Sequence, residues 1–242
     1  MAGDGRRRAW LVAAVVVALL LVGGGAYALL SLRTSDSPAP AALDEPVPTS
    51  PGSTATSGQA AAADSADGSW QISGDGSSFV GYRVREQLAF VSSPSGAVGR
   101  STAVTGTMQV AGDQVGAVRV EADLTRLESD EARRDNAIRQ NGLQSDQFPT
   151  ATFELTEPIR LDRAPADGQQ VTGKGKGRLT AHGVTHEVTV DLRGRWDGDT
   201  IQVAGQLPIR MTDYGIQPLQ IGPVVSIEDG MTVEFRLRFE RA

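Results

Sequence analysis

The stretch Met231-Thr-Val-Glu-Phe-Arg-Leu-Arg-Phe-Glu240 alternates apolar residues with polar or charged ones at every step. Successive side chains of a β-strand point to opposite faces, so this period of two indicates a strand with one buried and one solvated face. The same alternation runs through residues 118–124, 188–192 and 201–211. Its repetition in so many segments is typical of an antiparallel sheet that buries one face.

Further candidate strands lie at residues 79–88, 104–110, 152–161 and 171–181. The total of about eight short strands indicates an all-β domain. A sheet with one continuously apolar face can remove its exposed edges by closing on itself, so we expect an up-and-down antiparallel barrel. A sandwich of two sheets is the alternative, because its strands have the same pattern.

The segment between residues 127 and 148 interrupts the alternation. Ser129 suits a helix N-cap and Gly142 suits a helix end, while Asp130 and Arg134 have the spacing of a helical ion pair. We therefore predict one short, mostly polar helix. It is either a solvated crossover or a cover over one end of the barrel.

The N-terminus consists of a basic segment, residues 1–8, followed by an uncharged apolar run, residues 9–32. At about 1.5 Å per residue this run reaches roughly 36 Å as a helix, enough to cross a hydrocarbon core of about 30 Å. The positive-inside rule then predicts a single-pass cell-membrane anchor with the C-terminal part extracytoplasmic. The alternative is a signal peptide cleaved near Ala26-Tyr27-Ala28, followed by secretion.

Residues 33–68 consist mostly of Ala, Ser, Pro and Thr and contain no aromatic residue. Such a composition buries too little apolar surface to offset the entropy of ordering, so it predicts a disordered linker. The chain is thus divided into a basic segment, a transmembrane helix, this linker and a folded domain at residues 69–242.

Composition excludes several functions. The net charge of −6 argues against a nucleic-acid partner, and the absence of cysteine excludes disulfides, thiolate metal sites and an acyl anchor on cysteine. The sequence has two histidines: His182 lies in a predicted hairpin tip, His182-Gly183, and His186 follows it. They are interpreted as polar turn residues, with a metal site that includes Glu187 as the alternative. The motifs of hydrolases and phosphate-binding loops are missing from the sequence, so we predict neither a cofactor nor an enzyme.

One candidate strand carries glycines on its inner face. In residues 171–179 the charged side chains share one face, which places Gly173, Gly175 and Gly177 on the other. Glycine inside a strand often marks a bend or a close approach of another group. Two interpretations remain open: the glycines allow strand curvature or packing of a neighbouring ring, or they leave volume for an apolar guest.

Several short motifs follow one another along the folded domain in a defined order. They are Trp70-x-Ile72, Arg134-Asp135, Phe148-Pro149-x-x-x-Phe153, Gly177-Arg-Leu-Thr-Ala-His-Gly-Val-Thr185 and Arg210-x-x-Asp-Tyr-Gly215. Together they resemble the YceI-like, polyisoprenoid-binding family over residues 69–242. The resemblance implies an extended lipocalin-like antiparallel barrel that is exported and holds a long isoprenoid chain, such as that of a polyprenyl quinone.

An isoprenoid chain has no hydrogen-bonding group, so its affinity must come from contact with apolar side chains. The predicted cavity lining is Tyr82, Val84, Phe153, Leu155, Gly173, Gly175, Gly177, Leu179, Val190, Leu192, Trp196, Leu207, Ile209, Phe235 and Leu237. We expect a membrane-tethered protein that sequesters or carries an isoprenoid-type lipid without changing it. The alternatives are a structural or partner-binding β-domain with a filled core, for which the sequence identifies no protein partner, and an enzyme acting on such lipids.

Overall fold

In the computed structural model, the structure describes residues 38–44, 65–88, 95–219 and 224–242. The predicted basic segment and membrane span, residues 1–32, lie outside this part. Within the described ranges, no helix combines the length and apolar character that a membrane crossing requires.

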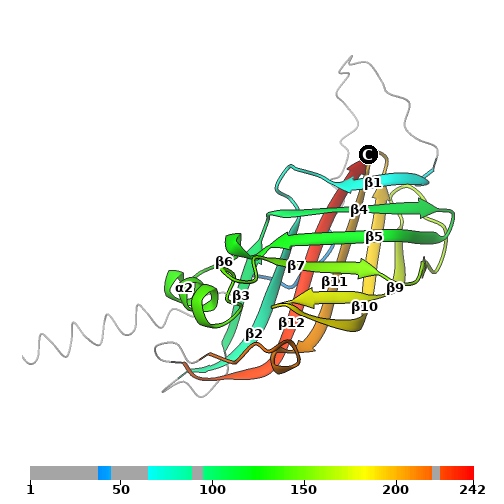
Figure 1. The fold of residues 1–242 in the computed structure, drawn as a ribbon. Helices are drawn as coiled ribbons and strands as arrows, with labels where there is room; N and C mark the ends of the chain where they lie inside the picture. Colours follow the sequence, from blue (N-terminus) through cyan, green and yellow to red (C-terminus); the bar gives the residue numbers. More distant parts are fainter. Residues whose placement is uncertain (1–37, 45–64, 89–94, 220–223) are drawn as a thin grey trace, which may run out of the picture. The chain divides into compact units, whose positions relative to one another are not determined.

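The described part of the chain is built almost entirely from strands (Figure 1). The strands are β1 (Gly68–Ile72), β2 (Phe79–Leu88), β3 (Ser95–Ser101), β4 (Val104–Ala111), β5 (Gln114–Asp123), β6 (Glu128–Ser129), β7 (Thr150–Leu155), β8 (Ile159–Arg160), β9 (Gln170–Ala181), β10 (Val184–Asp197), β11 (Thr200–Arg210) and β12 (Val224–Arg241). The other elements are the helix α2 (Ala132–Asn141) and the 3₁₀ turns η1 (Leu124–Arg126) and η2 (Met211–Tyr214).

Eight strands close into an antiparallel barrel in the order β1-β4-β5-β7-β9-β10-β11-β12, with β12 pairing back onto β1. The long strand β12 pairs with β1 near its C-terminal end, at residues 239–241, and with β2 over residues 224–236. Strands β2, β3 and β6 therefore extend the sheet from one side of the barrel. This closed circuit confirms the predicted all-β, lipocalin-like barrel and rules out the sandwich.

The alternation of buried and exposed residues follows the sequence pattern closely. In β9, Val171, Gly175, Gly177 and Leu179 are buried, while the intervening basic residues are exposed. The inner face predicted for the glycines is thus confirmed. His182 and Gly183 connect β9 to β10 with positive φ angles of 49° and 73°, as expected for a two-residue hairpin tip.

The observed strands differ from the predicted ones in several segments. The candidate strand at 152–161 is two strands, β7 and β8, because Pro158 lies between them and cannot donate a ladder hydrogen bond. Strands β1, β3 and β6 were not predicted. The sequence of β3, Ser-Gly-Ala-Val-Gly-Arg-Ser, has few apolar residues and no regular alternation.

The helix begins later than the sequence indicates. Its N-cap is Glu131, whose side chain accepts a hydrogen bond from the Arg133 N–H, instead of Ser129. Ser129 lies in β6 and donates to the Asp135 carboxylate over 2.5 Å. The predicted ion pair of Asp130 with Arg134 is present.

The buried apolar residues form two clusters, one at each end of the barrel. One contains Trp70 and Phe239, with relative exposures of 0% and 1%, and the other contains Tyr82 and Tyr214. Phe235 packs against both. The second cluster is the one that the helix approaches, because Ile138 of α2 packs against it.

Parts of the predicted disordered linker contact the barrel. Ala66 is buried, and β1 begins at Gly68, one residue before the predicted domain boundary. Residues 38–44 form hydrogen bonds with side chains on the outer face of the barrel. At these described positions the structure differs from the prediction that the whole of 33–68 is a disordered tether.

Candidate functional site

An apolar cavity lies inside the barrel. Its volume, measured with a water-sized sphere, is about 200 Å³. A single water needs roughly 10–15 Å³ on this measure, so the cavity has room for a sizeable organic guest. The lining draws on both apolar clusters, from Met108 and Phe239 at one end to Leu143 and Met231 at the other. The cavity therefore runs along the barrel between its two cores.

Most of the predicted lining residues do face this cavity. They are Tyr82, Phe153, Gly173, Leu179, Val190, Leu192, Trp196, Leu207, Ile209, Phe235 and Leu237. They come from the barrel strands β7, β9, β10, β11 and β12 and from β2, which pairs with β12.

The other four predicted residues do not line the main cavity. Val84 lines a second, smaller pocket, whose volume on the same measure is about 50 Å³. Leu155 is half-buried at the end of β7, where the chain leaves the sheet. Gly175 and Gly177 face inward, but the side chains of neighbouring residues cover them.

The inner glycines of β9 provide space for side chains of adjacent strands. A Cβ on Gly177 would collide with the Phe153 ring and lie 2.6 Å from the Glu154 carbonyl oxygen. A Cβ on Gly173 would lie 2.8 Å from Ile159 Cγ2. Of the two interpretations of these glycines, packing of a neighbouring ring therefore describes Gly177, and Gly173 both packs against Ile159 and borders the cavity.

The same arrangement recurs twice more around the barrel. The Phe235 ring lies over Gly205, with 2.5 Å between Phe235 Cζ and a Cβ built on the glycine, and the Tyr82 ring lies over Gly99 at the same separation. These residues are directly opposed on neighbouring strands. Because each ring occupies the volume of a missing side chain, it lies against the wall instead of projecting across the interior.

One polar group borders both pockets. Tyr82 is 6% exposed, and its hydroxyl is buried with no hydrogen-bond partner among the described residues. Burial raises the pKa of this phenol well above its ordinary value, so the hydroxyl stays protonated. An unpartnered buried hydroxyl costs free energy, and here it is available to a group on a bound molecule.

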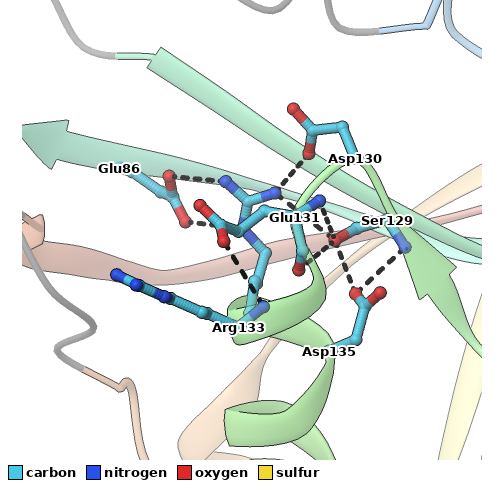
Figure 2. A network of polar contacts seen from close by, with 7 residues as sticks. Glu86, Ser129, Asp130, Glu131, Arg133 and Asp135 are labelled. Carbon is cyan, nitrogen blue, oxygen red and sulfur yellow. Dashed lines mark hydrogen bonds and ion pairs between the residues drawn. The ribbon is translucent and has the colours of Figure 1, made fainter. Parts of the chain in front are cut away.

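Beside the smaller pocket lies a charged network that joins β2, β6 and α2 (Figure 2). The Arg134 guanidinium pairs with Glu86, 3.4 Å away, and with Asp130. Burial acts to lower the pKa of Arg134, but the Glu86 and Asp130 carboxylates outweigh it and leave the pKa above its ordinary value. Asp135 accepts hydrogen bonds from the Ser129 N–H and hydroxyl, which fixes the start of the helix against β6. The network thus holds α2 over this end of the barrel.

The family model described as the YceI-like domain matches residues 70–239, which is nearly the whole barrel. This protein belongs to the YceI-like family.

Two solved structures share the YceI-like fold with this chain. A polyisoprenoid-binding domain from Saccharophagus degradans, implicated in plant cell wall breakdown, has a TM-score of 0.56 at 17% identity, with 72% of this chain and 98% of that chain covered. BcnA from Burkholderia cenocepacia has a TM-score of 0.51 at 19% identity, with 66% and 95% covered. A comparison with curated proteins gave no match.

Sequence reasoning missed part of the lining of this YceI-like barrel. The missed residues come from most of the strands, and those on β4, β5, β7 and β8 include Val110, Val115, Val118, Val120, Ala122, Ala151 and Ile159. For β5 the alternation itself carries the signal, because Val118, Val120 and Ala122 occupy every second position. Ile159 had no such signal, since it lies in a strand of only two residues.

The two histidines are structural in this YceI-like domain. His182 Nδ1 donates to the Tyr214 carbonyl over 3.0 Å, and His182 Nε2 lies 2.9 Å from Gln144 Oε1. His186 Nε2 donates to the Asp213 carbonyl over 2.9 Å. Among the described residues, no three His, Asp or Glu side chains gather in a way that could hold a metal ion. The two histidines therefore link the β9–β10 hairpin to η2 and to the chain that follows α2.

Proposed function

We propose that this protein sequesters or carries a long isoprenoid-type lipid, such as a polyprenyl quinone, inside its barrel. The observation that carries the proposal is the apolar cavity between the two cores. Buried apolar surface contributes roughly 25 cal/mol per Å², so about 400 Å² of buried isoprenoid chain would contribute about 10 kcal/mol. The polyisoprenoid-binding domain with the same fold supports this choice of ligand.

The polar end of such a lipid lies next to Tyr82 in this proposal. The Tyr82 hydroxyl is the buried, unpartnered donor at the junction of the two pockets. Nearby, the Glu86 carboxylate is paired with Arg134. A carbonyl or hydroxyl on the lipid would accept the Tyr82 hydrogen bond while the chain extends into the apolar cavity.

Replacing Tyr82 with Phe tests separately how the hydroxyl affects the stability of the lipid-free protein and how it affects lipid affinity. In the lipid-free protein we expect Tyr82→Phe to raise the free energy of unfolding by about 1 kcal/mol, because a buried group without a partner is removed. The affinity for a lipid with a polar head should fall severalfold. Urea denaturation and lipid titration measure the two effects. A destabilised lipid-free variant would show that the hydroxyl has a partner in the empty barrel.

The protein acts at a membrane in this proposal. The basic residues 1–8 and the apolar run 9–32 support an uncleaved single-pass anchor with the barrel on the extracytoplasmic side. A carrier tethered in this way stays near a membrane pool of its lipid. Protease added outside intact spheroplasts should remove the barrel from the membrane fraction, and a barrel that stays protected would contradict the orientation.

The proposal assigns binding without chemical change. The buried carboxylates Glu86 and Glu234 are both paired with arginines, which supports a structural role for them. A chemical step on the lipid would need a reactive group at the cavity, whereas the lining is dominated by aliphatic and aromatic side chains.

The test is to identify what the barrel holds. Full-length protein purified from a bacterial membrane is extracted with organic solvent, and the extract is analysed by mass spectrometry. We expect close to one isoprenoid-type lipid per protein. Because a membrane segment also carries loosely bound lipid, the reference is the Ala151→Phe variant described below, which keeps the N-terminal segment. Equal lipid in both proteins would favour a structural β-domain with no ligand.

A further inference from the structure

A fully buried glutamate lies on the outer face of the barrel. Glu234 of β12 is between Val233 and Phe235, which both face the cavity, so it must point outward. Its relative exposure is nevertheless 0%. The Glu234 carboxylate pairs with Arg100 over 2.7 Å and with Arg83 over 3.3 Å. Something outside the sheet therefore covers this ion cluster.

The cover includes residues 38–44, Pro-Ala-Pro-Ala-Ala-Leu-Asp, which we name the strap. Arg83 donates to the Pro38 carbonyl over 2.6 Å, and Arg100 donates to the Ala39 carbonyl over 2.7 Å. In turn, the Ala41 N–H donates to Glu234 Oε2 over 3.3 Å. The two arginines and the glutamate of the cluster thus all bind the strap backbone.

The other end of the strap is bound at Asp44. Its N–H donates to Gln202 Oε1 over 3.1 Å, and its carbonyl accepts from Arg195 over 2.8 Å. The Asp44 carboxylate pairs with Arg236. Arg195 and Gln202 are only 8% and 7% exposed, and Arg195 also borders the cavity.

The strap crosses the strands instead of pairing with one. Its partners lie on β3, β2, β12, β11 and β10, which are consecutive in the sheet. Four spacings of about 4.8 Å make roughly 19 Å, and six residue steps of about 3.3 Å make roughly 20 Å. An extended peptide of this length therefore fits across the surface. The two prolines favour the extended conformation before docking.

The six side chains that contact the strap form what we name the wall groove: Arg83, Arg100, Arg195, Gln202, Glu234 and Arg236. We propose that the wall groove is a peptide-binding site that recognises an extended backbone and one carboxylate, and that its occupant is the chain's own strap. Backbone groups supply most of the contacts, so small residues such as Ala suffice at the other strap positions.

Docking changes the length of the tether. With the strap bound, the free chain between residue 33 and the barrel is 33–37, which reaches at most about 18 Å when fully extended. With the strap released, the free part of the predicted linker runs over residues 33–64, and as a coil its root-mean-square span is roughly 31 Å with a much longer maximum. This consequence rests on the proposed membrane anchor, whereas the docking itself does not.

Amide hydrogen exchange in the full-length protein in detergent micelles tests the docking. The Ala41 and Asp44 amides should exchange at least tenfold more slowly than in a synthetic peptide of residues 36–46. Asp44→Lys should abolish this protection, because it replaces the Arg236 ion pair with repulsion. Asp64→Lys, with the same charge change elsewhere in the linker, should leave it intact. Exchange at the peptide rate in the native protein would overturn the proposal.

A second measurement tests the groove as a binding site. In a full-length variant with residues 38–44 replaced by Gly and Ser, the 36–46 peptide should bind saturably in an NMR titration. The peptide carrying Asp44→Lys should bind at least tenfold more weakly. No saturable binding at millimolar peptide would overturn the assignment of a peptide site. Lipid content is measured on the same samples. Protein that carries no lipid but has protected amides would contradict only the proposed function. Protein that carries lipid but has no protected amides would contradict only the docking of the strap.

Discussion

Gly177→Ala is expected to lower the free energy of unfolding by about 2–3 kcal/mol, while Gly175→Ala changes it by less than about 1 kcal/mol. The two glycines are neighbours on the same inner face of β9. A Cβ on Gly177 would collide with the Phe153 ring and come within 2.6 Å of the Glu154 carbonyl oxygen, so backbone must move. A Cβ on Gly175 meets Ile159 Cδ1 at 3.3 Å, which a small side-chain shift relieves.

Urea denaturation of both variants checks this difference. The pair is a matched control, because each change adds one methyl group to the same strand and removes one glycine from the unfolded chain. If the two variants lost the same stability, backbone conformation would be the reason for these glycines. A loss confined to Gly177 would show that ring packing requires the glycine there.

Ala151→Phe is expected to reduce lipid loading at least tenfold without lowering stability. Ala151 on β7 is directly opposite Ala122 on β5, and both line the cavity. A tenfold loss is about 1.4 kcal/mol, which corresponds to roughly 55 Å² of apolar contact. A phenylalanine side chain covers about 150 Å² or more, so its ring would displace more lipid contact than this.

The control for this variant adds the same ring to the outside of the barrel. Thr105 on β4 is exposed, and Thr105→Phe should leave the lipid content unchanged. Extraction followed by mass spectrometry measures both variants. Lipid content that is the same in native protein, Ala151→Phe and Thr105→Phe would mean that the lipid does not occupy this cavity.

The wall of the barrel was predictable because a strand with one buried face has a local pattern. The alternation in residues 231–240 placed Phe235 and Leu237 on the inner face, and both border the cavity. Strand β3 was not predictable in this way, because a Gly- and Ser-rich strand has no such pattern. Likewise, Ser129 has the local chemistry of a helix cap but bonds to Asp135 from a neighbouring strand.

Whether the interior is filled was not predictable from the strand pattern. Gly173, Gly175 and Gly177 look equivalent in sequence, but Gly173 borders the cavity and Gly177 lies beneath the Phe153 ring. The difference depends on the register of β7 against β9, where Phe153 is opposite Leu179 and Leu155 is opposite Gly177. Register between strands is a tertiary property, because it depends on side chains from distant segments packing together.

The sequence by itself determined the class of fold, the inner and outer faces of most strands and the resemblance to the YceI-like family, since each depends on residues close together in the chain. Only the tertiary structure decided that the interior is hollow and that Glu234 is buried. Alternation places that carboxylate in solvent, but its hydrogen-bond partner Ala41 is 193 residues away. Burial by a distant segment leaves no trace in a local pattern, because the energy of docking is set where the two surfaces meet.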